Sequence, residues 1–516
     1  MRFFHFASIA AALPASIVAQ NATVVFRPPG TPDKARTVPQ GYIGLGIEMK
    51  SFPDYMGHGS PNKLTRFLLS QIASRTNTPV PIRVGGTSMD NSLFSPKLTT
   101  NFTLPIGNLT QCRLHTNITI GQPWVDAFAY LNGSLARYTL QIPLARKNVT
   151  NGIDFANACL RKMPGGLGQV DALEIGNEPN LYAADGCEGK DRGPNFTPEV
   201  YARGWSGYAR RLQGGVQGMA GTPREFQALA VASRADLSVW NLTKIFTPLD
   251  RGGHVKTVSQ HYYQGLATGT LQEQLLTHKT TVSKMEHNFR ENVAFSQAHN
   301  ISLVLGEVGP ALGGEGAINP SLFRTLGAAL WSLDFLLYGM SMGITRVSMQ
   351  QGTNFRMSAW QPVNGGTAHP KAVHGNFHGL VAAADFIGTG GDFKIRTLPF
   401  DDHPEIVGYA GYNSEKLTKV FVLNLHVWNG QGDRSKRDVS LRNLGADVKR
   451  VRVSRLTSPN GAADEGNISW AGQQFTAENG GTVQPKGEKP TLRNVNNATS
   501  VVVAASEAVL VELLRS

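Results

Sequence analysis

The sequence predicts an α/β protein in which a (β/α)8 TIM barrel is followed by an all-β sandwich. Eight short apolar runs recur between residues 42 and 350, and most of the segments between them have helical periodicity. Near-continuous apolar strands that alternate with helices are typical of a parallel sheet covered on both faces, and eight such units close into a barrel. After about Ala383 the chain changes to strand-like runs separated by Asn, Gly, Asp and Pro, which indicates a β-sandwich.

The predicted barrel strands share a short apolar run and cover residues 42–48, 80–86, 138–144, 171–176, 227–233, 255–263, 302–307 and 344–350. Helical periodicity is clearest over residues 62–75, 199–215 and 322–340. A long stretch between the second and third strands predicts an insertion. We therefore expect four regions: a signal peptide over 1–19, a strand-forming segment over 20–40 that joins the sandwich, the catalytic barrel over 41–382 and the sandwich over 383–516.

The N-terminal segment is typical of a secretory signal peptide. Arg2 precedes a mostly apolar stretch that ends near Ala19, and this stretch is short for a membrane-spanning helix. No later stretch reaches that length, so no membrane span is expected. Sequons for N-glycosylation occur at Asn21, Asn101, Asn108, Asn117, Asn132, Asn148, Asn195, Asn241, Asn300, Asn467 and Asn497. These features predict a secreted, extracellular glycoprotein with a sugar-covered face near residues 101–148.

The three cysteines, Cys112, Cys159 and Cys187, allow one disulfide in an oxidising compartment, and their positions do not say which pair forms. Their spacings fit no zinc site, and no motif for a metal, a phosphate, a nucleotide or a serine nucleophile is present. We therefore expect no metal and no cofactor. The net charge of +12 is spread along the chain. Such a surface could attract an acidic polysaccharide, or it could simply be a solvated charged surface; nucleic acid is not an expected partner of a secreted protein.

Two predicted strand ends carry a glutamate. Glu178 follows the fourth strand in "LEIGNEPN", and Glu307 follows the seventh in "LVLGEVG". The carboxyl ends of barrel strands meet at one mouth, so both side chains are expected to face one pocket. A carboxylate pair suits cleavage of a glycosidic bond, in which one group donates a proton and the other attacks or activates water. The alternative is that each glutamate pairs with a basic residue on a loop.

The motifs "SFPDYMGHGSPNKLTRFLLSQIASRTNTPVPIRVGGTSMD", "LEIGNEPN", "SQHYY" and "LVLGEVGPALGG", in this order, resemble glycoside hydrolase family 79. That family contains fungal β-glucuronidases and, more distantly, heparanase. The resemblance extends from about Tyr42 to the C-terminus. It implies that Glu178 is the general acid/base and Glu307 is the nucleophile of a retaining mechanism.

Two of these motifs also predict residues around the catalytic pair. Asn177 is placed to bond the 2-hydroxyl of the sugar, a contact that strengthens in the transition state. By resemblance, Tyr262 or Tyr263 orients the nucleophile, and Tyr263 matches the second tyrosine of the related motif. Adjacent strand residues face opposite ways, so only one of the two points inward.

The resemblance further implies that Asp90 binds hydroxyl groups of the glycone. Glu48, at the end of the first strand, is a weaker candidate for the same role. Arg83, inside the second strand, is expected to be a structural partner of the catalytic carboxylates.

The expected carboxylate-binding positions of a uronate differ from the family pattern. Relatives use a tyrosine and two glycine amides after the nucleophile, with a second tyrosine after the eighth strand. The glycines match as Gly313 and Gly314, but the tyrosine positions hold Leu312 and Phe355. Backbone amides in a turn can bind an anion, and Arg356 could compensate for the lost hydroxyls. A different glycone therefore stays open.

Together these features predict a secreted retaining exo-β-glycosidase that acts on a carbohydrate. A β-glucuronidase that releases glucuronic acid, or its 4-O-methyl form, is the main interpretation. One alternative is an endo-acting, heparanase-like hydrolase of an acidic polysaccharide. An alternative of another class is an inactive carbohydrate-binding protein of the cell wall.

Overall fold

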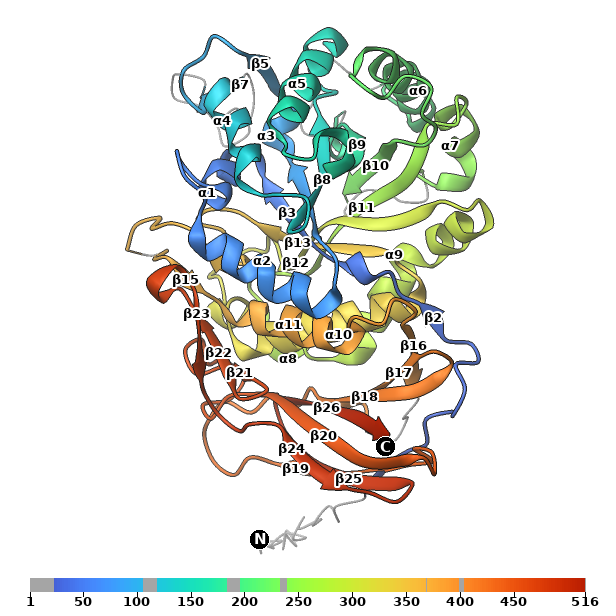
Figure 1. Ribbon diagram of the computed structural model, residues 1–516, viewed down its shortest axis with the longest axis vertical. Coiled ribbons are helices and arrows are strands. Elements are labelled where there is room, and N and C mark those ends of the chain that lie inside the picture. Colours follow the sequence, from blue (N-terminus) through green and yellow to red (C-terminus); the bar gives the residue numbers. More distant parts are fainter. Residues whose placement is uncertain are drawn as a thin grey trace, which may run out of the picture.

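The computed structural model describes residues 23–104, 118–182, 195–232, 239–367, 369–398 and 403–515. The predicted signal peptide, the sequons at Asn21, Asn108 and Asn117, and two of the cysteines, Cys112 and Cys187, lie outside the described residues. The third cysteine, Cys159, is buried and is not in a disulfide. Figure 1 shows the barrel at one end of the molecule and the C-terminal strands at the other.

Eight parallel strands form a closed barrel, and the predicted TIM barrel is confirmed. Each pairs with its neighbours along the chain, and the last pairs with the first. The strands are β3 (Ile43–Glu48), β4 (Val80–Gly85), β8 (Ala136–Ile142), β9 (Val170–Ile175), β10 (Phe226–Ala232), β11 (Val255–Gly265), β12 (Ser302–Ala311) and β13 (Arg346–Gln351).

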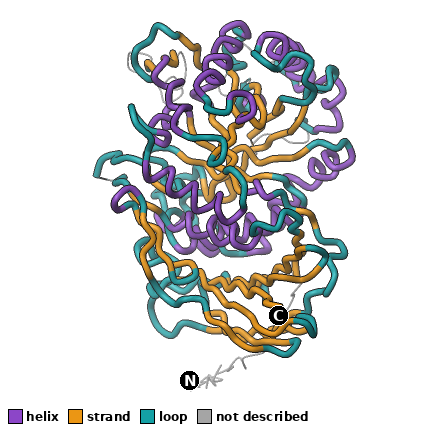
Figure 2. Tube along the Cα trace, viewed as in Figure 1, coloured by secondary structure: helices purple, strands orange, loops and turns teal. Residues whose placement is uncertain are grey.

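Helices surround this barrel, as the purple segments in Figure 2 show. Side-chain caps mark where several begin. For example, the Asn62 side chain accepts a hydrogen bond from the N–H of Thr65, and Thr325 accepts one from Ala328. The helices are α1 (Phe52–Met56), α2 (Lys63–Thr76), α3 (Thr87–Asp90), α4 (Gln122–Asp126), α5 (Val149–Lys162), α6 (Pro198–Gly215), α7 (Leu242–Leu249), α8 (Leu271–Gln274), α9 (His278–Ala298), α10 (Leu326–Met342) and α11 (Gly375–Ile387).

The stretch between the second and third barrel strands contains a small sheet. Strand β7 (Ile118–Gly121) lies between β5 (Ser92–Ser95) and β6 (Phe102–Thr103). A further short hairpin, β14 (Trp360–Gln361) with β15 (Ala372–Val373), follows the last barrel strand.

The C-terminal region consists of mainly antiparallel strands in two sheets with a second apolar core between them. Strand β1 (Val24–Phe26) pairs with β19 (Lys436–Arg442) in the smaller sheet, and β2 (Arg36–Thr37) pairs with β16 (Lys394–Leu398) in the larger one. The N-terminal strands thus lie in this region. The other strands are β17 (Ile406–Asn413), β18 (Lys416–Asn424), β20 (Val448–Thr457), β21 (Ser469–Trp470), β22 (Gln473–Thr476), β23 (Thr482–Pro485), β24 (Thr491–Asn494), β25 (Ala498–Ala504) and β26 (Glu507–Arg515).

Helices α10 and α11 lie between the barrel and the C-terminal strands (Figure 1). Nearly all of their residues are buried, because barrel strands cover one side and sheet residues cover the other. The phenol of Tyr409 donates to Asp334 of α10 at 2.7 Å, and the indole of Trp470 donates to Asp385 of α11 at 2.6 Å. The predicted boundary at residue 383 falls inside α11, whose apolar residues belong to the eighth barrel unit.

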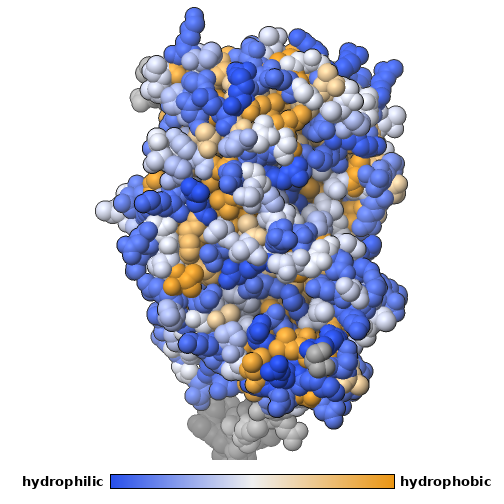
Figure 3. Space-filling model, viewed as in Figure 1, coloured by the Kyte–Doolittle hydropathy of each residue, from blue (hydrophilic) through white to orange (hydrophobic). Residues whose placement is uncertain are grey.

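The surface in Figure 3 is mainly hydrophilic, with apolar side chains in separate groups. Among the described residues, no helix combines the length and apolar character that a membrane crossing needs.

Candidate active site

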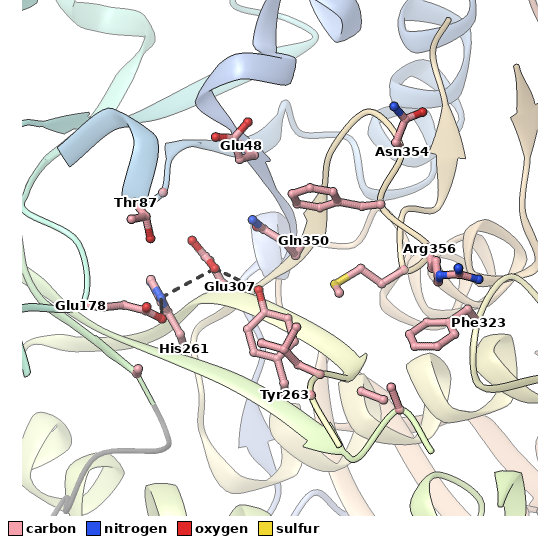
Figure 4. Close-up of a pocket in the computed structure, with 18 of the residues that line it drawn as sticks. Glu48, Thr87, Glu178, His261, Tyr263, Glu307, Phe323, Gln350, Asn354 and Arg356 are labelled. Atoms are coloured by element: carbon pink, nitrogen blue, oxygen red, sulfur yellow. Dashed lines mark hydrogen bonds and ion pairs between the residues drawn. The ribbon is translucent and has the colours of Figure 1, made fainter. Parts of the chain in front are cut away.

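A cavity of about 760 Å³ opens at the carboxyl ends of the barrel strands, and both glutamates singled out from the sequence line it. Figure 4 shows them on one side of this cavity. The other lining residues come mainly from the loops after the strands and are Glu48, Gly86, Thr87, Ser88, Leu181, Ala232, His261, Tyr263, Ala267, Ala311, Leu312, Gly313, Ile318, Phe323, Gln350, Asn354, Phe355, Arg356 and Met357.

The segment "LEIGNEPN" delivers Glu178 to the cavity by ending a strand in a sharp turn. Strand β9 ends at Ile175, and Gly176 takes a φ of +85° that suits glycine. Glu178 itself has a φ of +44°, in the left-handed region that costs a residue with a side chain about 1–3 kcal/mol. Pro179 then starts a short 3-10 turn. The strained backbone aims the carboxylate at the barrel mouth.

An irregularity in the neighbouring strand β10 holds this turn. Leu229 and Ala230 have φ values of +72° and +49°, and the pairing of β10 with β11 shifts register at this point, as in a β-bulge. The Ala230 carbonyl consequently accepts a hydrogen bond from the N–H of Glu178 at 2.8 Å. Glu178 is therefore positioned through the backbone of two adjacent strands.

Glu307 lies on β12 with hydrogen bonds to both oxygens of its carboxylate. The Arg83 guanidinium bonds Oε1, and the Tyr263 hydroxyl donates to Oε2 at 2.9 Å. Burial alone would raise the pKa of Glu307. The charges of His261 and Arg83, with the hydrogen bonds from Tyr263 and Arg83, outweigh burial and hold that pKa below its ordinary value. The side chain is thus kept as a carboxylate, the form that a nucleophile requires.

His261 stands between the two glutamates. Its Nδ1 is 3.0 Å from Oε1 of Glu178 and 3.8 Å from Oε2 of Glu307. One ligand atom from each of these three residues lies within 4.8 Å of the other two, so the two carboxylates approach to the separation of about 5 Å typical of retaining glycosidases. Such a cluster also has the spacing of a cation site, but Arg83 already offsets the charge of Glu307 there.

Arg83 links the catalytic residues to the barrel interior. Its Nε donates to Glu174 at 2.8 Å and its Nη2 donates to Asn177 at 2.7 Å, in addition to the bond with Glu307. Burial would lower the pKa of Arg83, but Glu174 and Glu307 hold it above its ordinary value, so the guanidinium stays charged.

Replacement of Arg83 by methionine is expected to destabilise the fold by about 3–5 kcal/mol, since it leaves Glu174 and Glu307 buried without a counter-ion. Urea unfolding measures this loss. The Arg83→Lys variant keeps the charge but not the planar guanidinium, so its free energy of unfolding should lie between those of the wild type and the methionine variant. A methionine variant as stable as the wild type would contradict the role given to Arg83.

The two tyrosines of "HYY" have different surroundings. Tyr263 faces the cavity and Glu307, whereas Tyr262 points outward, stacks on Phe335 at 5.6 Å and meets Phe289 edge-on. The alternative that Tyr262 contacts the nucleophile or the substrate is therefore corrected: its ring packs against helices α9 and α10. Tyr263 stays the candidate that orients the nucleophile.

Tyr263→Phe should move the acid limb of the kcat/KM profile to higher pH. The wild-type pKa of Glu307 lies below its ordinary value partly because Tyr263 donates to it, so the variant loses the ionised nucleophile earlier as the pH falls. We also expect kcat to fall roughly tenfold, since a hydrogen bond to a charged group contributes about 1.5 kcal/mol or more. A pH–rate profile on an aryl glycoside measures both. An unmoved acid limb would mean that Tyr263 does not act through Glu307.

Asp90 and Asn177 lie behind the cavity and do not line it. Asp90 is fully buried; its Oδ1 accepts hydrogen bonds from the N–H groups of Leu144 and Ala145, and its Oδ2 accepts one from the Tyr182 hydroxyl. The prediction that Asp90 binds sugar hydroxyl groups is therefore corrected. Its carboxylate instead holds two loops in position. Asn177 is 1% exposed and accepts from Arg83, so it supports the wall beneath the sugar position.

Glu48 lines the cavity with Oε1 free of any hydrogen-bond partner among the described residues, while its Oε2 accepts from the N–H of Lys50 at 2.8 Å. Gln350 similarly presents an unpartnered Oε1. A Cβ at Gly46 would come within 2.6 Å of that oxygen, so the close approach of Gln350 requires glycine at this position. Two buried acceptors beside the nucleophile fit hydroxyl donors of a bound sugar.

The end of the cavity farther from Glu178 holds the residues expected near a uronate carboxylate. Leu312, Gly313, Phe355 and Arg356 line it, whereas Gly314 does not. Gly313 has a φ of +72°, which suits the tight turn after β12. Arg356 therefore brings a positive charge to the place where the tyrosine hydroxyls are missing, and Figure 4 shows it beside Phe323.

Sequence reasoning missed His261, Thr87 and Gln350. His261 was detectable, because it lies two residues before Tyr263 and alternate strand residues share a face. Thr87 and Gln350 carry no comparable signal, since a polar residue near a strand end is common.

Comparison with known proteins identifies similar chains. Residues 408–510 match the glycosyl hydrolase family 79 C-terminal beta domain. A beta-glucuronidase of Neurospora crassa is 27% identical over 486 residues, covering 85% of this chain and 85% of that protein. A beta-glucuronidase of Aspergillus niger is 28% identical over 516 residues, covering 93% and 90%. The resemblance to family 79 predicted from the motifs is confirmed.

Solved structures agree on the fold. The crystal structure of a 4-O-alpha-L-rhamnosyl-beta-D-glucuronidase from Fusarium oxysporum superimposes with a TM-score of 0.79 at 22% identity, covering 95% of this chain and 100% of that one. An alpha-L-arabinofuranosidase from Thermotoga maritima gives 0.62 at 15% identity, covering 95% and 100%. At these low identities the structural similarity shows a shared fold, namely the barrel followed by the β region.

Proposed function

We propose that this O-glycosyl hydrolase, which carries the C-terminal β domain of glycoside hydrolase family 79, is a retaining exo-β-glucuronidase. Its substrate is a β-linked glucuronic acid at the end of a glycan or glycoside. The reaction replaces the glycosidic bond by a bond to water in two displacements at the anomeric carbon.

In the first displacement, a carboxylate oxygen of Glu307 attacks the anomeric carbon and the glycosidic C–O bond breaks. Glu178 donates its proton to the leaving oxygen, so the aglycone departs as a neutral alcohol. Tyr263 and Arg83 hold the attacking carboxylate in place through their hydrogen bonds.

In the second displacement, Glu178 takes a proton from water as the water oxygen attacks the same carbon. The ester bond to Glu307 breaks and the carboxylate is restored. Two inversions leave the sugar with the β configuration that it had in the substrate. His261, at 3.0 Å from Glu178, keeps that carboxyl group oriented in both steps.

The approach of Glu178 and Glu307 to within 4.8 Å is the observation that carries this proposal, because an inverting enzyme needs a wider gap to admit water. Proton NMR during hydrolysis of an aryl β-glucuronide tests it directly. The β-anomer of glucuronic acid should appear first and then mutarotate; initial release of the α-anomer would overturn the retaining mechanism.

The choice of glucuronic acid is supported by the two fungal relatives, both beta-glucuronidases, and by the positive charge of Arg356 at the far end of the cavity. A panel of aryl β-glycosides with a common leaving group, glucuronide against glucoside, galactoside and xyloside, tests it. The glucuronide should have the highest kcat/KM. A neutral glycoside that reacts faster would replace glucuronic acid as the glycone.

Arg356→Ala should raise KM for the aryl glucuronide roughly tenfold, since it removes one charge-assisted contact to the uronate carboxylate. The matched xyloside, which has no carboxylate, should be unaffected. Arg66→Ala, which removes an exposed arginine on α2, serves as the control for general charge effects. Equal losses on glucuronide and xyloside would show that Arg356 does not read the carboxylate.

Secretion as a glycoprotein belongs to the same proposal. It is supported by five sequon asparagines that are exposed in the described residues, Asn132, Asn148, Asn195, Asn300 and Asn497. Expression in a fungal host should deliver the protein to the medium, with a mass that falls on treatment with an endoglycosidase. An intracellular protein of unchanged mass would contradict it.

A further inference from the structure

A second cavity, of about 810 Å³, lies on the flank of the barrel between helices α6 and α7. Both helices are in the upper right of Figure 1. The charged groups that line this cavity are all basic: Arg203 and Arg210 from α6, Arg251 after α7, and His254. It shares no lining residue with the catalytic cavity.

The cavity is also far from the catalytic residues. His254 directly precedes the first residue of β11, whereas His261 lies seven residues further along the same strand. At about 3.3 Å per residue, these positions are about 23 Å apart. A ligand in the flank cavity therefore does not fill the barrel mouth.

The three arginines form no ion pair with a carboxylate in the described part of the chain. The acidic residue closest in sequence, Asp250, accepts a hydrogen bond from the N–H of Val255 and pairs with Arg224. Asp250 lies close enough to act on His254, but the three arginines themselves have no carboxylate partner among the described residues.

His254 is a buried histidine that lines the same cavity. Its side chain is 6% exposed, it lines the cavity, and its Nδ1 is buried without a hydrogen-bond partner among the described residues. Its ring lies against Gly252, where a Cβ would come within 2.2 Å of Nε2. A buried polar atom without a partner is costly and points to a ligand or water in the native protein.

Gly207 is one of the residues that line the cavity. Gly207 lies in the middle of α6, where glycine destabilises a helix by about 0.5–1 kcal/mol relative to alanine. A Cβ at Gly207 would meet nothing within 4 Å, so packing does not require the glycine. Its absence of a side chain keeps the surface between Arg203 and Arg210 clear.

The spacing of the basic side chains along the cavity favours a ligand with several anionic groups over a single ion. Arg203 and Arg210 are seven residues apart on α6, which places them on one face at about 10 Å. The lining residues include no Phe, Tyr or Trp, so a broad platform for stacking of a neutral sugar or a base is not offered. Recognition would be ionic and sensitive to salt.

From these observations we infer that the cavity between α6 and α7 is a second, non-catalytic site that binds carboxylate groups along an acidic polysaccharide. The choice of polysaccharide over nucleic acid rests on the proposed glucuronidase function. The site would hold a polyuronate chain on the enzyme while its ends reach the barrel mouth.

Affinity electrophoresis through gels that contain polygalacturonate tests this site, because that polymer offers uronates without a terminal glucuronide. The triple variant R203A/R210A/R251A should bind at least tenfold more weakly than the wild type at low salt. The control R66A/R161A/R211A removes the same charge from exposed arginines outside the cavity, and Arg211 is on α6 itself. It should change affinity less than twofold.

Both triple variants should keep the wild-type melting temperature and the wild-type rate on a small aryl substrate. Equal losses in the two triple variants would mean diffuse charge attraction and would overturn the site. So would unchanged binding by R203A/R210A/R251A, binding of free phosphate without binding of the polymer, or equally tight binding of a single-stranded oligonucleotide. If the aryl β-glycosides showed that glucuronide is not the preferred substrate, the glucuronidase proposal would fall. The binding of polygalacturonate by the wild type and the two triple variants would still decide whether the second site exists.

Discussion

Glu307→Gln is expected to lower kcat on an aryl β-glucuronide by at least about 10⁴-fold while the protein stays folded. The amide keeps the shape of the side chain but has no negative charge with which to attack the anomeric carbon. The amide also fills the same space between Arg83, Tyr263 and His261, so the packing around residue 307 is kept. Steady-state kinetics with circular dichroism as a check on folding measures the effect.

A covalent probe identifies the same residue independently. A 2-deoxy-2-fluoro β-glucuronide with a good leaving group should accumulate as an ester on the nucleophile, since the fluorine slows the second displacement. Digestion and mass spectrometry should find the added mass on the peptide that contains Glu307. A label on Glu178 or Glu48, or wild-type turnover by Glu307→Gln, would reassign the nucleophile.

Glu178→Ala should produce the second largest loss, and the loss should depend on the leaving group. An alkyl glucuronide needs its leaving oxygen protonated, so its rate should fall roughly 10²- to 10⁴-fold. A dinitrophenyl glucuronide leaves without help, and its first displacement should be almost unaffected. A plot of rate against leaving-group pKa measures the difference, and equal losses for alkyl and aryl substrates would count against the acid role.

The base role of Glu178 has its own test. With Glu178→Ala the glycosyl-enzyme on Glu307 should persist, because no base activates water. Added azide, an anion that needs no base, should attack the anomeric carbon, release Glu307 and yield a β-glucuronosyl azide. An absence of rate recovery with azide would show that the second step is not limited by the missing base.

The sequence was sufficient for the barrel because hydrophobic patterning acts over short distances. Each of the eight apolar runs lies within a few residues of an observed strand, and the glutamates follow from their places at strand ends. Whether Tyr262 or Tyr263 faces the nucleophile could be decided only in the structure, because the register of β11 sets which of the two points into the barrel mouth. The predicted boundary near residue 383 falls inside α11, because this helix is buried on nearly all sides and gives no clear apolar stripe in the sequence.

The support of Glu178 could not be predicted for a different reason. Nothing about "LAVA" suggests that Leu229 and Ala230 adopt positive φ values, since both residue types disfavour them. That conformation is imposed by the fold around β10. Likewise, the bonds of Asp90 depend on where two distant loops meet, which no local pattern records.

The joint between the barrel and the C-terminal strands has a consequence for how this enzyme can be cut and recombined. One continuous apolar core runs from the barrel helices into the larger sheet, and it includes Tyr409, Phe421 and Trp470. A gene fragment that stops after α11 would leave that face of α10 and α11 in water and would encode an aggregation-prone polypeptide. We therefore expect that a barrel exchanged between relatives needs its matching sheet, and that shuffling libraries should place their crossovers elsewhere.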